Sequence, residues 1–269
     1  MTLPGWLRSV LPPDTAATWG TIAGIVPAAA YLAGGTAVSV HLHHRVSRDL
    51  DFFYHHDALD LDALAESLRE LGPFAVTRRS PGTLNGEFST TRLQFLHADE
   101  GEAQTLLEEP TLVEGLHIAG ISDLLAMKLK VIGDRGEARD YFDLMTIELK
   151  TGRRAEEGLG LFLARYNVPA EQALASIDPI VRGLGYFGDV EEDEALPVPL
   201  EEIAAYWQRR QPEIVAHIDR FGAVLPAESS PPLSAGTGSG SGSGAGGSVS
   251  VRAYRRADGS QVREHKRSR

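Results

Sequence analysis

The chain has 269 residues, of which 42% are hydrophobic and 23% are charged, a composition that is ordinary for a globular protein with a substantial core. It contains no cysteine, which excludes disulfides, thiolate metal sites and cysteine nucleophiles. Its net charge of −11 disfavours general binding of nucleic acid by the chain as a whole.

The charge is distributed unevenly along the chain. Residues 250–269 carry seven Lys or Arg against two acidic residues, a net charge of +5 that leaves −16 for residues 1–249. A nucleic acid bound by the acidic body would need a local basic patch, whereas a basic tail favours such binding. We therefore expect any recruitment of RNA by general charge to involve the tail.

The chain shows no sign of a membrane segment. The least polar run, Gly24 to Gly35, is too short to span a bilayer and contains Pro27. The first residues lack the basic start and the long apolar stretch of a secretory signal. We expect a cytoplasmic protein that does not bind a membrane.

Residues 15–55 predict a helix, a turn, a second helix and a strand, in that order. The turn contains Gly34 and Gly35, and the helix that opens at Thr36 runs to about His44. Glycines let the backbone approach a phosphate, and the N-terminus of the following helix supplies N–H donors and a favourable dipole. A plain tight turn is the alternative, and the residues downstream decide between the two.

The strand predicted at residues 49–54 places two carboxylates on one face. Side chains alternate between faces in an extended segment, so Asp49 and Asp51 point the same way while the apolar residues beside them point into a core. Two neighbouring carboxylates repel each other unless a cation lies between them, and Mg²⁺ held by carboxylates and substrate phosphates is the usual partner. The pair predicts a magnesium site for phosphoryl or nucleotidyl transfer.

The middle of the chain predicts the rest of a small sheet. Asp60 caps a helix that continues to Leu71 with apolar positions at helical spacing. Short strands follow at residues 74–79, 86–89 and 92–97. We expect these strands to join the strand at residues 49–54.

From Ser122 onward the pattern is helical. Helices are predicted at residues 122–132, 137–150, 155–166, 169–177 and 200–220. The predicted fold class is therefore α+β: a small mixed sheet flanked by helices, followed by a helical lobe.

Two charged residues lie among apolar positions on adjacent predicted helices. Lys128 falls on the apolar side of the first helix, and Asp140 falls between apolar positions of the second. A buried ion pair and a shared cleft both explain this placement, and we favour the cleft. Asp143 either assists this pair or faces solvent. A lysine that snorkels outward is the plain alternative for Lys128.

Other polar residues carry weaker signals. His41 and His44 share a helix face at a spacing compatible with metal binding, but surface histidines are the preferred interpretation. The acidic run at residues 191–194 predicts a solvated loop.

Four arginines lie near the expected cleft in sequence. They can meet a triphosphate or an RNA backbone, or can simply decorate helices. The second interpretation is preferred for Arg153 and Arg154, and both remain open for Arg135 and Arg139.

The composition changes abruptly at residue 234, where a Gly/Ser-rich stretch begins. We expect four parts, namely a core at 15–120, a helical lobe at 121–225 that completes the active-site cleft, a flexible linker at 226–250 and a basic tail at 251–269. Within the tail, Asp258 and Gly259 predict a marginal hairpin turn, and a disordered tail is an equally good interpretation.

Several of these segments together, in this order, resemble the AbiEii/AbiGii-type nucleotidyltransferases of the DNA polymerase β-like superfamily. The resemblance runs from about Val26 to Met145, nearly half of the chain. It is carried by residues 32–37, 45–53, 83–86, 92–95, 123–129 and 139–144. It implies a polymerase β-like nucleotidyltransferase core.

The resemblance implies where the donor nucleotide binds. Gly34, Gly35 and Thr36 would hold the triphosphate of an NTP. Arg45 and Ser47 would assist them. The donor substrate is therefore expected to be a nucleoside triphosphate.

The resemblance also implies the catalytic residues. Asp49 and Asp51 would bind Mg²⁺, Lys128 would contact phosphate, and Asp140 would orient the lysine or act as a base. Polymerase β-like sites usually carry a third carboxylate on a later strand. The corresponding position here is Gln94, which is neutral and cannot act as a base.

The resemblance finally implies a biological role. Members of this family are typically toxins of toxin–antitoxin or phage-defence systems, and some transfer nucleotides onto tRNA. We therefore expect a metal-dependent nucleotidyltransferase with an RNA acceptor, tRNA-like in kind, and a cognate antitoxin as partner. A protein or small-molecule acceptor and a non-catalytic nucleotide-binding module are the alternatives.

Overall fold

The computed structural model describes residues 3–55, 59–99 and 103–222, together with four short strands between residues 248 and 268. The chain divides into two units, Met1–Leu225 and Pro226–Arg269. No helix among the described residues is long and apolar enough to cross a membrane.

The second unit contains two pairs of antiparallel strands. The first pair is β8 (Ser248–Val251) with β11 (His265–Ser268), and the second is β9 (Tyr254–Arg255) with β10 (Gln261–Val262). The predicted hairpin turn at Asp258 and Gly259 and the Gly/Ser-rich stretch up to residue 247 lie outside the described residues.

The first unit is built around one seven-stranded mixed sheet. Its strands are β1 (Tyr31–Ala33), β2 (Leu50–Tyr54), β3 (Phe74–Ser80), β4 (Thr83–Phe88), β5 (Thr91–His97), β6 (Thr111–Val113) and β7 (Leu116–Ile118). They are ordered β3-β4-β5-β2-β1-β7-β6. Only the β2–β5 and β1–β7 pairs are parallel.

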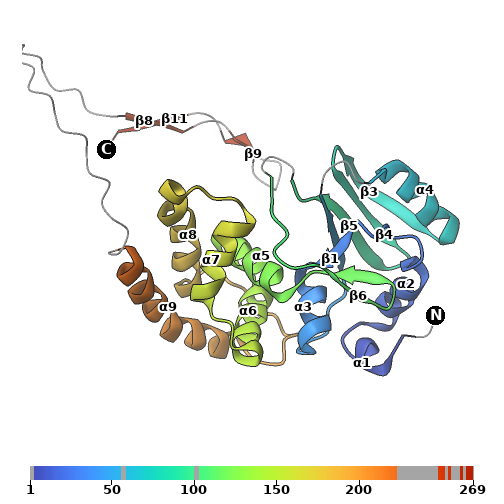
Figure 1. The fold of residues 1–269 in the computed structure, drawn as a ribbon, viewed down its shortest axis with the longest axis horizontal. Coiled ribbons are helices and arrows are strands. Elements are labelled where there is room, and N and C mark those ends of the chain that lie inside the picture. Colours follow the sequence, from blue (N-terminus) through green and yellow to red (C-terminus); the bar gives the residue numbers. More distant parts are fainter. Residues whose placement is uncertain are drawn as a thin grey trace, which may run out of the picture. The chain divides into compact units, whose positions relative to one another are not determined.

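Helices accompany the sheet and then form a lobe of their own (Figure 1). The helices within the first half are α1 (Gly5–Arg8), α2 (Pro13–Ile22), α3 (Gly34–Leu42) and α4 (Leu61–Leu71). The lobe contains α5 (Ile121–Asp134), α6 (Ala138–Thr151), α7 (Ala155–Arg165), a 3₁₀ turn (Ala170–Gln172), α8 (Ala173–Gly185) and α9 (Leu200–Gly222). The predicted α+β class is thereby confirmed.

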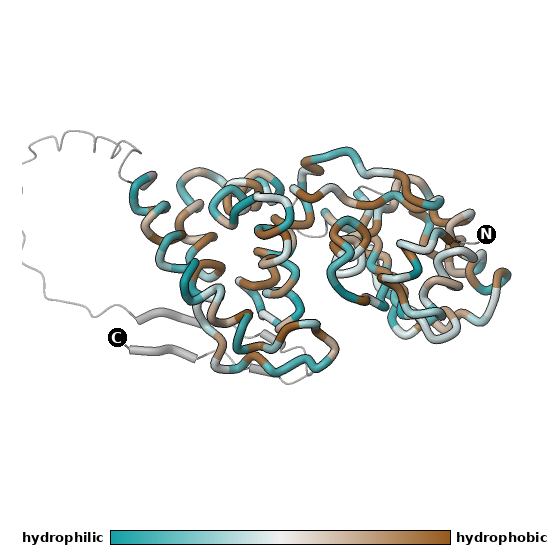
Figure 2. Tube along the Cα trace, turned by 90° about the horizontal axis from the view of Figure 1, so that it is seen from below, coloured by the Kyte–Doolittle hydropathy of each residue, from teal (hydrophilic) through white to brown (hydrophobic). Residues whose placement is uncertain are grey.

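Helix α3 connects the sheet to the lobe. It follows β1 directly and contacts β1 and β2 as well as α5 and α6. Its first turn therefore lies where the sheet, α5 and α6 meet. The lobe helices alternate hydrophobic and hydrophilic stretches along their turns (Figure 2), as expected of helices that pack on one side.

Several predicted elements are confirmed with small shifts of their ends. Asp60 caps α4 by accepting the backbone N–H groups of Asp62 at 3.1 Å and Ala63 at 3.0 Å. Helix α3 begins at Gly34, two residues before the predicted start, because the second glycine is already helical. Strand β4 begins at Thr83, three residues earlier than predicted.

Other elements differ from the prediction. Strand β1 was not predicted, because its three residues are all buried and so show no alternation. The helix predicted at 169–177 is a 3₁₀ turn followed by α8, which continues to Gly185 through Pro179. Helix α8 passes the proline because Ile177, Ile180 and Leu184 on both sides of it are buried.

Candidate active site

The turn between β1 and α3 places backbone directly against a carboxylate. Gly34 has φ of +66°, a left-handed conformation that favours glycine, and a Cβ atom there would lie 2.8 Å from Asp51 Oδ2. At Gly35 a Cβ atom would collide with the guanidinium of Arg45. Position 34 therefore requires glycine, whereas a side chain at residue 35 would displace the Arg45 guanidinium.

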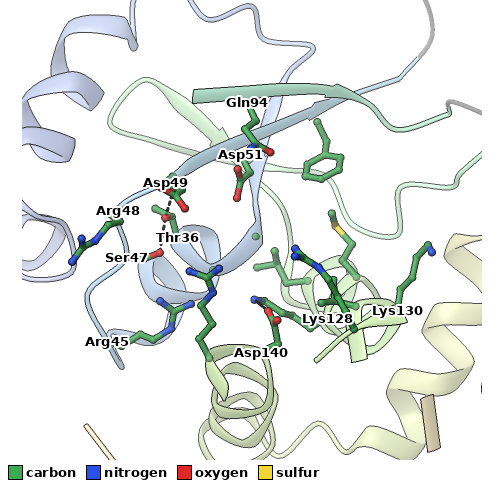
Figure 3. A pocket seen from close by; sticks show the side chains of 18 of the residues that line it. Thr36, Arg45, Ser47, Arg48, Asp49, Asp51, Gln94, Lys128, Lys130 and Asp140 are labelled. Carbon is green, nitrogen blue, oxygen red and sulfur yellow. Dashed lines mark hydrogen bonds and ion pairs between the residues drawn. The ribbon is translucent and has the colours of Figure 1, made fainter. Parts of the chain in front are cut away.

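Two buried hydroxyls tie this turn to the strand that follows. Thr36 Oγ1 donates to the carbonyl oxygen of Asp49 at 2.5 Å, and it also shares a hydrogen bond of 2.8 Å with the Ser47 hydroxyl. Thr36 and Ser47 both line the cavity (Figure 3). In this arrangement their hydroxyls fix the position of the carboxylates relative to the first turn of α3.

Asp49 and Asp51 line the same cavity. Asp51 lies on β2 between Ala33 of β1 and Gln94 of β5, which are its register partners. Burial, together with the negative charge of Asp49, raises the pKa of Asp51 to about 6. Among the described residues Asp51 forms no ion pair, and the nearest cation to Asp49 is Arg92, whose Nη1 is 4.0 Å from Asp49 Oδ2.

The carboxylate pair fits a divalent cation that a substrate helps to hold. No three His, Asp or Glu side chains gather as a metal site within the described part of the chain. The nearest protein cation, on Arg92, is 4.0 Å from Asp49, so the two carboxylates are suited to a divalent cation that oxygen atoms of a ligand would help to hold. A cation between them would remove the repulsion that raises the pKa of Asp51.

A buried charge cluster forms the opposite side of the cavity. Lys128 Nζ lies 2.7 Å from Asp140 Oδ1 and 2.7 Å from Asp143 Oδ2. Arg45 binds Asp143 with two hydrogen bonds, from Nε at 2.6 Å and from Nη2 at 2.9 Å. His44 Nε2 lies 2.7 Å from the same carboxylate.

Asp143 is the centre of this cluster. Burial opposes its ionisation, but the charges of Lys128 and Arg45 outweigh burial and hold the pKa of Asp143 well below its usual range. Burial lowers the pKa of His44, so His44 is a neutral hydrogen-bonding partner. Asp143 therefore stays charged and holds Lys128 and Arg45 in fixed positions.

These contacts decide between several sequence interpretations. Lys128 and Asp140 form a buried ion pair, and both also line the cavity. The ion-pair interpretation and the cleft interpretation are therefore both correct. The solvent-facing alternative for Asp143 is wrong, because its side chain is fully buried. The surface interpretation of His44 is wrong as well, because only 2% of its side chain is exposed.

The cavity has a volume of about 760 Å³, and its lining is polar in one part and apolar in another. The apolar part of the wall includes Phe53 and Leu96 from the sheet and Met127 from α5. Asp193, Ala195 and Leu196 also line it, from the segment between α8 and α9. The acidic run at 191–194 is a mostly exposed loop, as predicted, and its half-buried Asp193 also contributes to the cavity wall.

The four arginines near the cleft in sequence separate into two groups. Arg135 and Arg139 line the cavity, and each also pairs with Glu137. Arg153 and Arg154 form ion pairs on the lobe and do not line this cavity. Only the first pair is placed to meet a ligand there.

The polar end of the cavity contains residues that sequence reasoning did not single out. Arg48 and Lys130 line it, as do Gln104 and Tyr166. Their types are common on protein surfaces, and only their placement by the fold marks them. Figure 3 shows Gln94 and Asp51 on the sheet side, and Lys128 and Asp140 on the lobe side.

Comparisons with known proteins place the glycine turn and the carboxylate pair in a known family. Residues 26–95 match the family model described as "Nucleotidyl transferase AbiEii toxin, Type IV TA system". This segment contains the glycine turn and the carboxylate pair. A curated relative, the uncharacterized protein aq_aa25 of Aquifex aeolicus, is 30% identical over 183 residues, which are 66% of this chain and 81% of the relative.

Similar solved structures include two bacterial proteins. JHP933 from Helicobacter pylori is 20% identical, with a TM-score of 0.47 over 81% of this chain and 98% of its own. MenT4, a nucleotidyltransferase toxin from Mycobacterium tuberculosis, is 16% identical, with a TM-score of 0.46 over 80% of this chain and 88% of its own. On the family match and the curated relative, the chain belongs to the AbiEii nucleotidyl transferase family and is a nucleotidyltransferase.

Proposed function

We propose that the protein transfers a nucleoside monophosphate from an NTP to the end of an RNA, tRNA-like in kind, with the help of Mg²⁺. The observation that carries the proposal is the contact between the glycine turn and the carboxylate pair at Gly34 and Asp51. A triphosphate on the turn and a cation on the carboxylates would then be neighbours. Nucleotidyl transfer requires that arrangement.

The donor NTP would bind with its triphosphate over the first turn of α3. The backbone N–H groups there have no partner within the helix, and the helix dipole favours an anion. Arg45 and Lys128 supply positive charge from the lobe side. The apolar wall at Phe53, Leu96 and Met127 suits the nucleobase.

The carboxylates of Asp49 and Asp51 would hold the divalent cation, for which their shared negative charge and close placement are suited. Bound Mg²⁺ would neutralise charge that develops on the α-phosphate. An acceptor hydroxyl attacks the α-phosphorus in line, its new O–P bond replaces the bond to pyrophosphate, pyrophosphate leaves, and the acceptor proton passes to solvent.

Asp140 acts in this proposal by orienting Lys128. One carboxylate oxygen contacts Lys128 Nζ at 2.7 Å, and the other accepts the backbone N–H of Glu137 at 3.3 Å. Both oxygens are thus engaged inside the protein, which favours a positioning role over that of a base. Gln94 lies beside Asp51 and, being an amide, can position an acceptor but cannot deprotonate it.

We further propose that the protein acts in the cytoplasm as a toxin or in phage defence and is restrained by a cognate antitoxin. The description of the matching family as a toxin of a type IV toxin–antitoxin system supports this role. In this proposal the core at 15–120 binds the NTP, and the lobe at 121–225 completes the cleft.

The test is transfer of label to RNA. The full chain is incubated with Mg²⁺, total cellular RNA and each NTP labelled on either the α- or the γ-phosphate. Label from the α-position, and none from the γ-position, is expected on tRNA-sized RNA. Label on a protein or a small molecule would show that this molecule, and not RNA, is the acceptor. Label from the γ-position on RNA would indicate phosphoryl transfer instead of nucleotidyl transfer.

A further inference from the structure

Strands β3, β4 and β5 have one covered face and one open face. Phe74, Leu84, Phe88, Leu93 and Phe95 alternate along them and are buried on the side where α2 and α4 pack. The intervening residues point to the opposite side. We call that side the open face, and it carries Arg78, Asn85, Glu87, Arg92 and Gln94, all of them exposed or partly exposed.

The open face runs without interruption into the carboxylate pair. Strand register places Arg78 opposite Asn85, Asn85 opposite Gln94, and Gln94 opposite Asp51. This row crosses four strands, so Arg78 lies roughly 14 Å from Asp51, the width of three strand spacings. A short extended strand of nucleic acid can cover that distance.

Both arginines of this face are exposed, and Arg92 has only one distant carboxylate partner. Most arginines of the described chain pair with carboxylates, whereas Arg78 forms no ion pair with a described residue. Arg92 has a side chain that is 65% exposed, and its nearest carboxylate oxygen is 4.0 Å away on Asp49. In a body with net charge −16, these side chains form a local site that can accept phosphate.

A neutral group in the same row also lacks a partner. The side-chain oxygen of Asn85 is buried and has no hydrogen-bond partner among the described residues. An acceptor left unpaired costs free energy unless a ligand or a water supplies a donor.

The donor nucleotide would occupy the other part of the cavity. The glycine turn, Arg45 and Lys128 lie on the α3 and lobe side, whereas Gln94 lies with Asp51 on the sheet side (Figure 3). The sheet side is therefore left for the second substrate.

We infer that the single-stranded end of the RNA acceptor lies across the open face, with phosphates on Arg78 and Arg92 and its terminal ribose at Asp49 and Asp51. This inference rests on the proposed function. Phosphate contacts of this kind fix the register of a strand and carry no sequence information. The open face would therefore hold a single-stranded end in register without recognising its sequence.

Matched substitutions test the inference. Arg78→Ala and Arg92→Ala remove cations from the open face, and Arg79→Ala is the control, because Arg79 pairs with Asp62 of α4 on the covered side at 2.9 Å. The probe is a fluorescein-labelled single-stranded oligoribonucleotide, bound to the full chain and followed by anisotropy across a salt series. Transfer of α-label to RNA and the KM for the NTP are measured in parallel.

Arg78→Ala and Arg92→Ala should each raise the Kd for the oligoribonucleotide about tenfold, the loss expected for one charged hydrogen bond. Each should lower the salt slope of binding by about 0.7, and Arg78→Ala, which is remote from the carboxylate pair, should leave the KM for the NTP unchanged. Arg79→Ala should match the unmodified chain in every readout.

Three results would overturn parts of the account, and they are distinguishable. If the open-face variants bind and label RNA as the unmodified chain does, the inference is wrong and the proposed function stands. If Arg79→Ala weakens binding as much as Arg78→Ala, the effect does not belong to the open face and the inference is wrong. If the unmodified chain labels only a protein or a small molecule, the proposed function itself is wrong.

Discussion

Gly34 and Asp51 are in direct contact across the β1–α3 turn and β2: a Cβ atom on residue 34 would lie 2.8 Å from the Asp51 carboxylate. The two residues are seventeen positions apart in the sequence and become neighbours because β1 and β2 pair antiparallel, with Ala33 opposite Asp51. The turn that we propose for phosphate and the carboxylate pair that we propose for a cation thus share one site. The predictions below follow from this site and from the charge clusters around it.

Gly34→Ala should abolish transfer and destabilise the fold modestly. The left-handed φ of +66° costs an L-residue about 1–2 kcal/mol, and the new methyl group displaces the Asp51 carboxylate. Gly152→Ala is the matched control, because Gly152 has φ of +75° and open space around its Cβ position. Denaturant unfolding and transfer rate are measured for both. Equal activity loss in the two variants would contradict the role of the contact.

Asp51→Asn should remove activity and make the metal-free protein more stable. Burial and the charge of Asp49 raise the pKa of Asp51 to about 6, so the folded state binds the proton more tightly than the unfolded state. Stability is therefore present at low pH and is lost as pH rises through about 6. Loss of this ionisation at pH 8 should raise stability by about 2–3 kcal/mol.

The measurement is thermal unfolding of both proteins between pH 4 and pH 8, buffered with a chelator. The gain in Tm of Asp51→Asn should grow as the pH rises from about 4 to about 6 and should stay near its full value up to pH 8. Added Mg²⁺ should stabilise the unmodified protein and should leave the variant unaffected. A variant that is less stable at pH 8 would refute the electrostatic account of the pair.

Asp143→Asn should be the most damaging single change in the lobe-side cluster. It leaves Lys128 and Arg45 buried without their shared counter-charge, which costs roughly 3–5 kcal/mol. Asp140→Asn should cost less, because Lys128 keeps Asp143 at 2.7 Å. Urea unfolding ranks the two variants. A smaller loss for Asp143→Asn than for Asp140→Asn would show that Asp143 is not the centre of the cluster.

Glu148 should contribute stability that disappears in acid. Burial opposes its ionisation, but hydrogen bonds from Arg210 and Tyr206 outweigh burial and lower the pKa of Glu148. The stabilisation is complete above about pH 4.5, the ordinary value for Glu, and is lost as pH falls through the lowered pKa. Glu148→Gln should therefore show a shallower loss of Tm below this pH than the unmodified chain. Parallel curves would contradict the contribution of this group.

The strand predicted at 49–54 begins one residue later, at Leu50, so Asp49 precedes β2. The shared direction of Asp49 and Asp51 could still be predicted from sequence, because residues two apart in an extended segment point the same way. The cap of α4 by Asp60 could also be predicted, because the capping side chain binds backbone N–H groups only two and three residues away. These features depend on short stretches of chain. They are the ones in which prediction and structure agree most closely.

Asp143 and His44 could not be assigned in this way. Helix α6 is buried on nearly all sides, from Asp140 through Glu148, so its periodicity does not separate a solvent face from a core face. The meeting of His44 and Arg45 with Asp143 joins residues about a hundred positions apart. Asp193 reaches the cavity only because α8 and α9 carry its segment there.

Incorporation of α-labelled nucleotide into RNA by the full chain, compared with Asp51→Asn under the same Mg²⁺, tests the central claim most directly. Circular dichroism first establishes that both proteins are folded. The account predicts label on RNA, release of pyrophosphate in equal amount, and loss of both with the variant or with a chelator. Equal labelling by Asp51→Asn, or labelling that persists with the chelator, would contradict it.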